Sequence, residues 1–359
     1  MRPYVAPEAL QLIKSTFDSK WIGAGQRVDE FEKAISAWIH NPNFLALNSC
    51  TSAITLALRI AGIGEGAEVI STPMTCVATN VPIAHSGARI VWADVSAEDG
   101  TISPTSIQGK ITDKTRAIVM VHYGGYPCEI DEIRRIASHN NLVLIEDAAQ
   151  ALGSYYHGVP IGSHSNFVCF SFQSVKIVTT VDGGGIAFTD PERLVAAQKL
   201  RWFGIDRHIG NFLDSDIDDI GYRFTLNDVL ASIGLANITH LPELLDRRLE
   251  IASIYSNELS SMRELKVCHP VNDSRRSSYY LFPILVPDKN RFIDMMNGRG
   301  IECSAVHRRN DNYTVFSRFR TGHLPGVDRW DQRMVCIPIG HWLNDGDIWH
   351  IVKSIKEGY

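Results

Sequence analysis

The sequence predicts an α/β protein: a large, mainly parallel β-sheet domain covered by helices, followed by a smaller C-terminal α+β domain. Two observations predict this fold. Short apolar stretches alternate with helical stretches as far as Gln150, which is typical of βα units. The chain has 359 residues, more than a single hydrophobic core usually needs.

The first half of the chain supplies the predicted parallel sheet. Apolar, β-branched runs predict strands, and they lie at residues 43–47, 67–72, 88–95, 116–125 and 142–150. Between them, capping residues and apolar periodicity predict helices at residues 48–62, 76–87 and 128–141. This alternation predicts crossover connections and hence parallel neighbours.

The pattern changes after Leu200. Long helical patterns occupy residues 226–241 and 242–262, and further helices are predicted at 290–300 and 346–359. One strand is predicted at 277–286. We place the domain boundary near residues 242–247, which gives a large cofactor-binding domain at 1–241 and a small domain at 242–359.

Composition excludes several classes of protein. The net charge of −5 indicates no basic nucleic-acid-binding surface, and no apolar run approaches the roughly 18 residues of a membrane span. The N-terminus does not read as a signal peptide. Seven scattered cysteines without a C-x-x-C pair argue against a disulfide framework and a zinc site. We therefore expect a reduced, cytoplasmic protein without a metal.

Candidate functional residues follow the predicted strands, because ligands of α/β proteins bind at the carboxyl ends of the strands. "NSCTSA" at residues 48–53 begins a helix, and its free amides suit a phosphate, although a plain helix cap has the same composition. Asp147 in "LIEDAAQALG" could serve a metal, a ribose or a protonated ring nitrogen, or cap a helix.

The stretch "FSFQSVKIVTTVDGGGIAFTD" contains one basic residue, Lys176, in apolar surroundings. Burial in apolar surroundings lowers the pKa of a lysine, and the neutral amine is a nucleophile that forms Schiff bases with carbonyl groups. Alternatively, the Lys176 side chain extends from the strand end to the surface. The Ser171 hydroxyl can bind phosphate, and glycines 183–185 allow a close backbone approach. Arg223, before a helix, could bind phosphate or carboxylate, or be solvated.

In this order, five motifs resemble one known family. "NSCTSA", "EDAAQALG", "SFQSVK", "TTVDGGG" and "GYRFTLNDVLASIGLA" are similar to the DegT–StrS group of fold-type I, pyridoxal-phosphate (vitamin B6)-dependent nucleotide-sugar aminotransferases. "WIGAGQRVDEFEKAI" and "MVCIPIGHWLNDGDIWHIV" extend the resemblance over nearly the whole chain.

The resemblance implies a role for each motif residue. Lys176 would be the Schiff-base lysine of pyridoxal phosphate and the proton shuttle of catalysis, with the pyridoxamine form arising during turnover. Asp147 would keep the ring nitrogen protonated, and Gln150 would bind near the ring hydroxyl. The remaining cofactor contacts would come from Cys50, Thr51, Cys76 and Ser171. Some relatives replace the lysine with histidine and become dehydratases, so the retained Lys176 favours transamination.

Two segments depart from the family pattern. Cys76 stands where an aromatic residue usually stacks on the ring. Arg223 and Thr225 stand where the family has asparagine and arginine. The resemblance implies that Arg223 reaches the cofactor phosphate of a neighbouring subunit or binds substrate, and that the active unit is a homodimer.

The substrate implied by the resemblance is a nucleotide-linked keto-sugar for surface polysaccharide, such as O-antigen, or related amino-sugar biosynthesis, with glutamate as donor. Candidate substrate contacts are Trp21, His307, Arg308 and Asn310. A smaller phosphorylated ketone or a keto-acid sugar remains open as substrate. A nicotinamide oxidoreductase would need G-x-G-x-x-G after the first strand, and a non-catalytic regulatory relative would lack Lys176 or Asp147.

Overall fold

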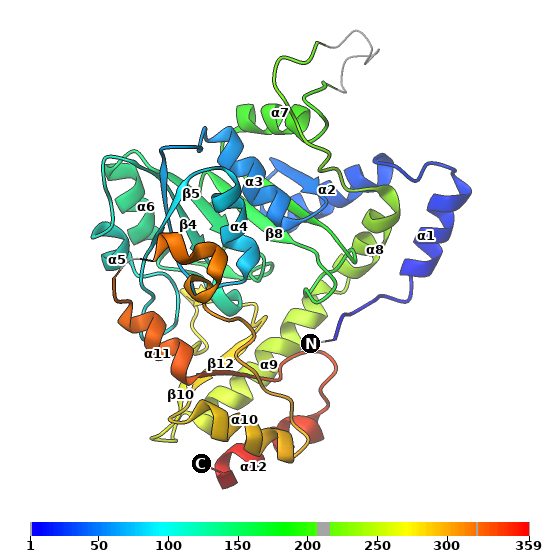
Figure 1. Ribbon diagram of the computed structural model, residues 1–359. Helices are drawn as coiled ribbons and strands as arrows, with labels where there is room; N and C mark the ends of the chain where they lie inside the picture. Colours follow the sequence, from blue (N-terminus) through cyan, green and yellow to red (C-terminus); the bar gives the residue numbers. More distant parts are fainter. Residues whose placement is uncertain (1, 207–215, 321, 359) are drawn as a thin grey trace.

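The computed structural model describes residues 2–206, 216–320 and 322–358. Its centre is a seven-stranded sheet with the order β1-β9-β8-β5-β4-β2-β3 (Figure 1). These strands are β1 (Phe44–Leu47), β2 (Glu68–Ser71), β3 (Arg89–Trp92), β4 (Thr115–Val121), β5 (Val143–Asp147), β8 (Phe167–Ser171) and β9 (Gly184–Phe188).

The mainly parallel sheet predicted from the sequence is confirmed. The pairs β2–β3, β2–β4, β4–β5 and β5–β8 are parallel. Only β9 runs against its neighbours, because it pairs antiparallel with both β8 and β1. The five strands predicted before residue 150 correspond to β1 to β5.

Helices cover the sheet. Helix α3 packs on β8 and β9, and α2 packs on β1 and α8; α4 lies beside α3 in front of the sheet in Figure 1. The helices of this part are α1 (Ala9–Asp18), α2 (Gln26–Ile39), α3 (Cys50–Ile60), α4 (Val77–His85), α5 (Pro104–Gln108), α6 (Ile130–His139), α7 (Pro191–Leu200) and α8 (Asp228–Ile238). Those predicted from capping patterns, α3, α4, α6 and α8, are all present.

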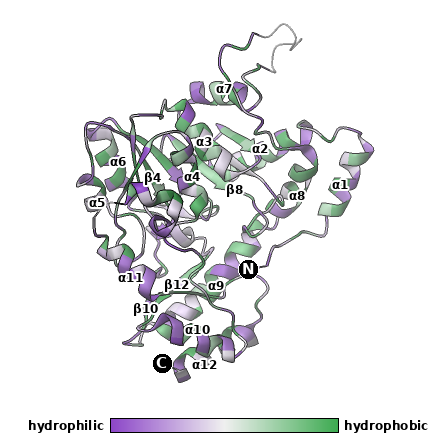
Figure 2. Ribbon diagram, viewed as in Figure 1, coloured by the Kyte–Doolittle hydropathy of each residue, from purple (hydrophilic) through white to green (hydrophobic). Residues whose placement is uncertain are grey.

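The strands of the large sheet are hydrophobic, whereas the covering helices turn polar residues outward (Figure 2). All four residues of β1 are buried, as are all residues of β4 except Arg116. Burial on both faces explains why the sequence of these strands reads as continuous apolar runs. In the described part of the chain, no helix has both the length and the apolar character required to cross a bilayer.

Helix α9 (Leu241–Leu259) leads from the large sheet into the C-terminal part (Figure 1). That part holds the antiparallel sheet β10-β12-β13 and the helices packed on it. Its elements are β10 (Lys266–Val267), β12 (Phe282–Leu285), β13 (Met334–Ile337), α10 (Lys289–Gly298), α11 (Pro325–Arg333) and α12 (Asp345–Gly358). A separate hydrophobic cluster lies within residues 251–355. The domain division at 241/242 itself stays a prediction.

A third small sheet, β11-β6-β7, joins the two parts of the chain. It comprises β11 (Arg275–Arg276), β6 (Tyr155–Tyr156) and β7 (Val159–Pro160). Short 3₁₀ turns lie at Tyr123–Gly125, Asn310–Asn312 and Thr314–Phe319. The terminal helix was predicted through residue 359, which lies outside the described residues.

The strand predicted at 277–286 is shorter than expected. Only Phe282–Leu285 forms β12. Tyr279 adopts a left-handed conformation (φ 48°), which no extended strand permits. The Ser277 hydroxyl accepts the Tyr279 amide at 2.9 Å, and Arg248 donates to the Tyr279 carbonyl at 2.7 Å. These side-chain bonds replace the strand ladder and turn the next residue, Tyr280, toward the large sheet.

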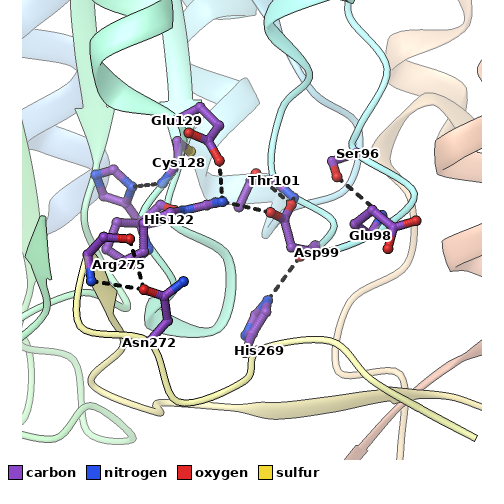
Figure 3. Close-up of polar contacts among 12 residues, drawn as sticks. Ser96, Glu98, Asp99, Thr101, His122, Cys128, Glu129, His269, Asn272 and Arg275 are labelled. Carbon is purple, nitrogen blue, oxygen red and sulfur yellow. Dashed lines mark hydrogen bonds and ion pairs between the residues drawn. The ribbon is translucent and has the colours of Figure 1, made fainter.

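A buried polar contact fixes the C-terminal part against the large sheet (Figure 3). Arg275 forms an ion pair with Asp99 (3.0 Å), and His269 donates from Nε2 to the Asp99 carbonyl (2.9 Å). The His269 ring also stacks on Tyr126, with ring centroids 4.6 Å apart. Tyr126 directly follows the turn at Tyr123–Gly125, in which the Gly124 amide bonds Gln150. The stacking of His269 on Tyr126 therefore fixes the C-terminal part relative to the large sheet next to Gln150.

Candidate active site

A cavity of about 290 Å³ opens at the carboxyl ends of the central strands. Its walls come from the starts of α3 and α4, the ends of β5 and β8, the turn that carries Lys176, and two segments of the C-terminal part. The residues singled out from the sequence that line it are Cys50, Thr51, Cys76, Asp147, Gln150, Ser171, Lys176 and His307.

The start of α3 forms one end of the cavity. Ser49 caps the helix by accepting the amide of Ser52 at 3.0 Å. The amides of Cys50 and Thr51, which precede Ser52, make no hydrogen bond with any described residue. Free amides at a helix N-terminus form a binding site for an anion such as a phosphate. The expectation of a phosphate-binding turn therefore agrees with the geometry, and the plain-cap interpretation accounts for Ser49 alone.

The three glycines after Lys176 bring β9 close to this turn. Gly184 pairs with Leu47 of β1, and a Cβ at Gly184 would overlap the backbone of Ser49 and Cys50. A side chain at Gly185 would likewise overlap the Phe44 ring. Only glycine therefore lets the reversed strand pass against the start of α3.

Asp147 lies on the floor of the cavity and is held by donors from three elements. It accepts the Ala149 amide (3.0 Å) and the Thr79 hydroxyl (2.6 Å). The Cys50 thiol donates to it at 3.9 Å. Burial, reinforced by Asp147, raises the pKa of Cys50 well above its usual range, so Cys50 remains a donor. Its oxygens are therefore fixed as acceptors, and the carboxyl group lines the cavity.

Lys176 lies in a turn after β8, not in a strand. Its ammonium lies over the Tyr280 ring, 4.5 Å from the centroid. It makes no ion pair with a carboxylate of the described residues. An amine held by an aromatic face is available for covalent chemistry, whereas a salt-bridged one is not.

Gln150 and His307 form the opposite wall. The side-chain oxygen Oε1 of Gln150 accepts a hydrogen bond from the Gly124 amide at 2.7 Å. The side-chain nitrogen Nε2 of Gln150 therefore faces Nε2 of His307, at 3.3 Å. His307 Nε2 is then the acceptor, and the ring is neutral. Burial, with the nearby Lys176 charge, lowers the pKa of His307 to about 4, in agreement with this tautomer.

Trp21 and Arg223 do not line this cavity. Trp21 is 58% exposed and donates to the Ala24 carbonyl at 3.2 Å. Arg223 is exposed, lies over the Trp202 ring at 4.0 Å, and donates to Thr225. Its backbone adjoins the α3 start, because Asn48 donates to the carbonyl of the next residue, Phe224, at 2.8 Å. Within the described chain, therefore, neither side chain reaches this cavity.

Arg308 and Asn310 also lie outside the lining. Arg308 is exposed and lies over the Tyr313 ring at 5.1 Å. Asn310 is fully buried; it donates to the Thr75 carbonyl and accepts from Asn80, both at 2.8 Å. In this chain Asn310 therefore anchors the loop that carries His307, and its amide is directed at protein groups.

Two lining residues escaped the sequence analysis. Thr79 bonds Asp147, and Tyr280 supports Lys176. Thr79 offered a signal, since it lies in the first turn of the helix predicted at 76–87, four residues after Thr75, which closely follows the strand predicted at 67–72. Tyr280 offered none, because the residue was assigned to a regular strand whose side chains alternate.

The residues present suit pyridoxal phosphate. Uncapped amides and the Ser171 hydroxyl match its phosphate, the fixed Asp147 acceptor matches a protonated ring nitrogen, and Lys176 matches its aldehyde. The aromatic rings of the described lining are Tyr280 and His307, and Cys76, at the position where the family pattern has an aromatic residue, lines the same cavity.

Comparison with known proteins agrees with this set of residues. The model of the DegT/DnrJ/EryC1/StrS aminotransferase family matches residues 3–356. The chain is 31% identical to a dTDP-4-dehydro-2,3,6-trideoxy-D-glucose 4-aminotransferase of Saccharopolyspora spinosa, over 99% of this chain and 95% of that protein.

Solved structures show the same fold. The sugar aminotransferase CalS13 of Micromonospora echinospora superposes with a TM-score of 0.95 at 34% identity, covering 100% of this chain and 99% of that chain. The PLP form of Spr1654, a putative sugar aminotransferase of Streptococcus pneumoniae, gives a TM-score of 0.92 at 25% identity over 99% and 97% of the chains. The predicted fold-type I architecture is confirmed.

Proposed function

The chain belongs to the DegT/DnrJ/EryC1/StrS aminotransferase family, whose members are pyridoxal-phosphate-dependent transaminases, and we propose that it aminates a nucleotide-linked keto-sugar with glutamate as the amino donor. The product would serve surface polysaccharide, such as O-antigen, or related amino-sugar biosynthesis. One observation carries the proposal: Lys176, Asp147 and the start of α3, with the free amides of Cys50 and Thr51, line a single cavity.

When bound, pyridoxal phosphate takes up the amino group and withdraws electrons from the substrate carbon through its protonated ring. The chain's own residues do the rest. The amides of Cys50 and Thr51, with the Ser171 hydroxyl, bind the phosphate. Asp147 would accept the ring N–H, and Gln150 would bind near the ring hydroxyl. Lys176 would hold the aldehyde.

During turnover, Lys176 Nζ moves the proton at the substrate carbon that bears the amine. The Tyr280 ring beneath it restricts where the amine can lie. His307 is neutral and can offer a hydrogen bond to a sugar hydroxyl without adding charge. Trp21 and Arg308 stay proposed substrate contacts that would act through loop movement or a partner subunit. Asn310, also predicted as a contact, would act indirectly, by holding the loop that carries His307.

The proposed active unit is a homodimer with shared sites in the cytoplasm. Arg223 is exposed and lies beside the start of its own α3, so a second copy packed on this edge would face it. There it would bind either the neighbouring cofactor phosphate or an anionic substrate group. Exposed apolar side chains on the same side, Phe17, Trp21 and Ile22, are compatible with a contact between copies.

The test is a spectrum of the purified holoprotein before and after addition of glutamate. The cofactor absorbance should change from the aldehyde form to the amine form as 2-oxoglutarate is released. A keto-sugar nucleotide panel, read by mass spectrometry for the amino product, then identifies the acceptor. The panel includes smaller phosphorylated ketones and keto-acid sugars, and a product from those alone would replace the nucleotide-sugar proposal.

A further inference from the structure

Two threonine hydroxyls form a hydrogen-bonded chain that ends on Asp147. Thr79 Oγ1 lies 2.6 Å from Asp147 Oδ2, and Thr75 Oγ1 lies 2.9 Å from Thr79 Oγ1. Both threonines are only 1% exposed and both line the cavity. An ionised carboxylate only accepts, so Thr79 must give its single proton to Asp147. Thr75 then donates to Thr79, and both hydroxyls point toward the carboxylate.

The start of α4 sets this geometry. The helix begins at Val77 after Cys76, so Thr75 and Thr79 lie one turn apart on the same side. The Thr75 carbonyl accepts from Asn310 at 2.8 Å, and Asn310 also accepts from Asn80. Asn80 and Asn310 are both fully buried. The threonine pair therefore has no freedom to turn away from Asp147.

The chain of hydroxyls affects the charge of Asp147. Hydrogen bonds to the ionised form of a carboxyl favour that form, and burial opposes it. Asp147 is buried, so each of its donors matters. Without the Thr79 hydroxyl, Asp147 Oδ2 would lose the hydrogen bond that orients it, and the carboxyl would be a poorer acceptor for a protonated ring nitrogen.

We propose that Thr79, oriented by Thr75, is a positioning residue for transamination: its hydroxyl holds the Asp147 carboxyl as an acceptor directed at the ring nitrogen of pyridoxal phosphate. The inference rests on the proposed function, because it needs the cofactor. It assigns the α4 start a task at the floor of the site in addition to its Cys76 contact.

The test compares Thr79→Val with Thr79→Ser. Valine keeps the shape of threonine and removes the hydroxyl, whereas serine keeps the hydroxyl. Each holoprotein is prepared with pyridoxal phosphate labelled with ¹⁵N at the ring nitrogen, and NMR reports whether that nitrogen is protonated. The dissociation constant of the cofactor and kcat/KM for transamination are measured in parallel.

We expect a protonated nitrogen in the unmodified protein and in Thr79→Ser, and a signal shifted toward the unprotonated form in Thr79→Val. Loss of one hydrogen bond to a charged group should lower kcat/KM of Thr79→Val about 10- to 100-fold, mostly in kcat. Thr239→Val is the matched control, because the Thr239 hydroxyl bonds only a helix carbonyl, that of Ala236.

Unchanged nitrogen protonation and kcat/KM in Thr79→Val would overturn the inference, as would a Thr79→Ser variant as defective as valine. Thermal unfolding of the cofactor-free variants separates these results from misfolding. If the unmodified protein bound no pyridoxal phosphate, the proposed function would fall together with this inference. If it bound and transaminated while Thr79→Val did the same, only the role of Thr79 would fall.

Discussion

The floor and the rim of the cavity are built differently. On the floor, Asp147 accepts three donors from α3, α4 and its own loop, and Thr75 and Thr79 are only 1% exposed. The rim is the group of predicted contact residues that lie outside the cavity lining. Its arginines Arg223 and Arg308 are exposed, and they lie over the rings of Trp202 and Tyr313. The floor is therefore complete within one chain, whereas the rim residues have only local partners.

This difference separates chemistry from specificity. A cofactor whose reactive atoms must be held within fractions of an ångström needs fixed, buried groups. Contacts to a variable sugar can come from loops or from a second subunit. We therefore expect substitutions on the floor to affect cofactor chemistry in every assay, and substitutions on the rim to affect substrate use or depend on the assembly.

The largest effect should come from the floor, at Lys176. Lys176→Ala removes the only amine that lines the described cavity, so borohydride should no longer fix the cofactor to the protein. We expect kcat to fall at least about 1,000-fold, because covalent attachment and proton transfer are both lost. Mass spectrometry of the reduced protein measures the attachment.

Lys199→Ala is the control, because Lys199 lies on α7, outside the lining of this cavity. It should retain attachment and activity. A Lys176→Ala protein that still became covalently labelled would show that another amine holds the cofactor, and the assignment of the floor would be wrong.

Burial should also govern how the protein responds to acid. Burial lowers the pKa of His269 to about 4, against 6.5 for an exposed histidine. Between these values the unfolded chain binds the proton and the folded one does not, so the free energy of unfolding falls as pH falls from 6.5 to 4. One fully buried histidine contributes about 3 kcal/mol over this interval. Urea unfolding at successive pH values measures the slope.

His269→Gln should reduce the slope of the unfolding free energy against pH by the equivalent of about one bound proton. The variant will also be less stable at neutral pH, because the hydrogen bond from His269 to the Asp99 carbonyl is lost. Equal slopes for the native protein and His269→Gln would mean that His269 is protonated when folded.

The sequence predicted the floor better than the rim for a physical reason. Asp147, Ser171 and the α3 start all follow buried strands, and parallel strands deliver their carboxyl ends to one edge. Lys176 could be placed because it follows such a strand closely. Asn310 could not, because its burial depends on Asn80 and on the Thr75 carbonyl, far away in the sequence. Tyr280 depended on the left-handed Tyr279, which the apolar pattern of that segment hid.

The rim can be tested by complementation at Arg223. Arg223→Ala should lower kcat/KM about 10-fold or more, because a hydrogen-bonded arginine–anion contact is lost. If the residue serves the neighbouring subunit, a co-expressed mixture of Arg223→Ala and Lys176→Ala chains forms heterodimers with one intact site. Such a mixture should recover roughly a quarter of native activity, given random pairing. No recovery above the two single variants would place Arg223 at its own site.

The smallest effect should come from substitution of Cys76, a lining residue of the cavity. Cys76 lines the cavity but offers no ring face. Cys76→Phe should supply an offset-stacked contact and tighten pyridoxal phosphate binding about 2- to 10-fold, the range of an aromatic pair. Cys76→Leu adds bulk without a π face and serves as the matched control. Fluorescence titration of the cofactor-free proteins measures the change. Equal affinity of the phenylalanine and leucine variants would show that Cys76 does not face the ring, and that the aromatic contact comes from His307 or Tyr280.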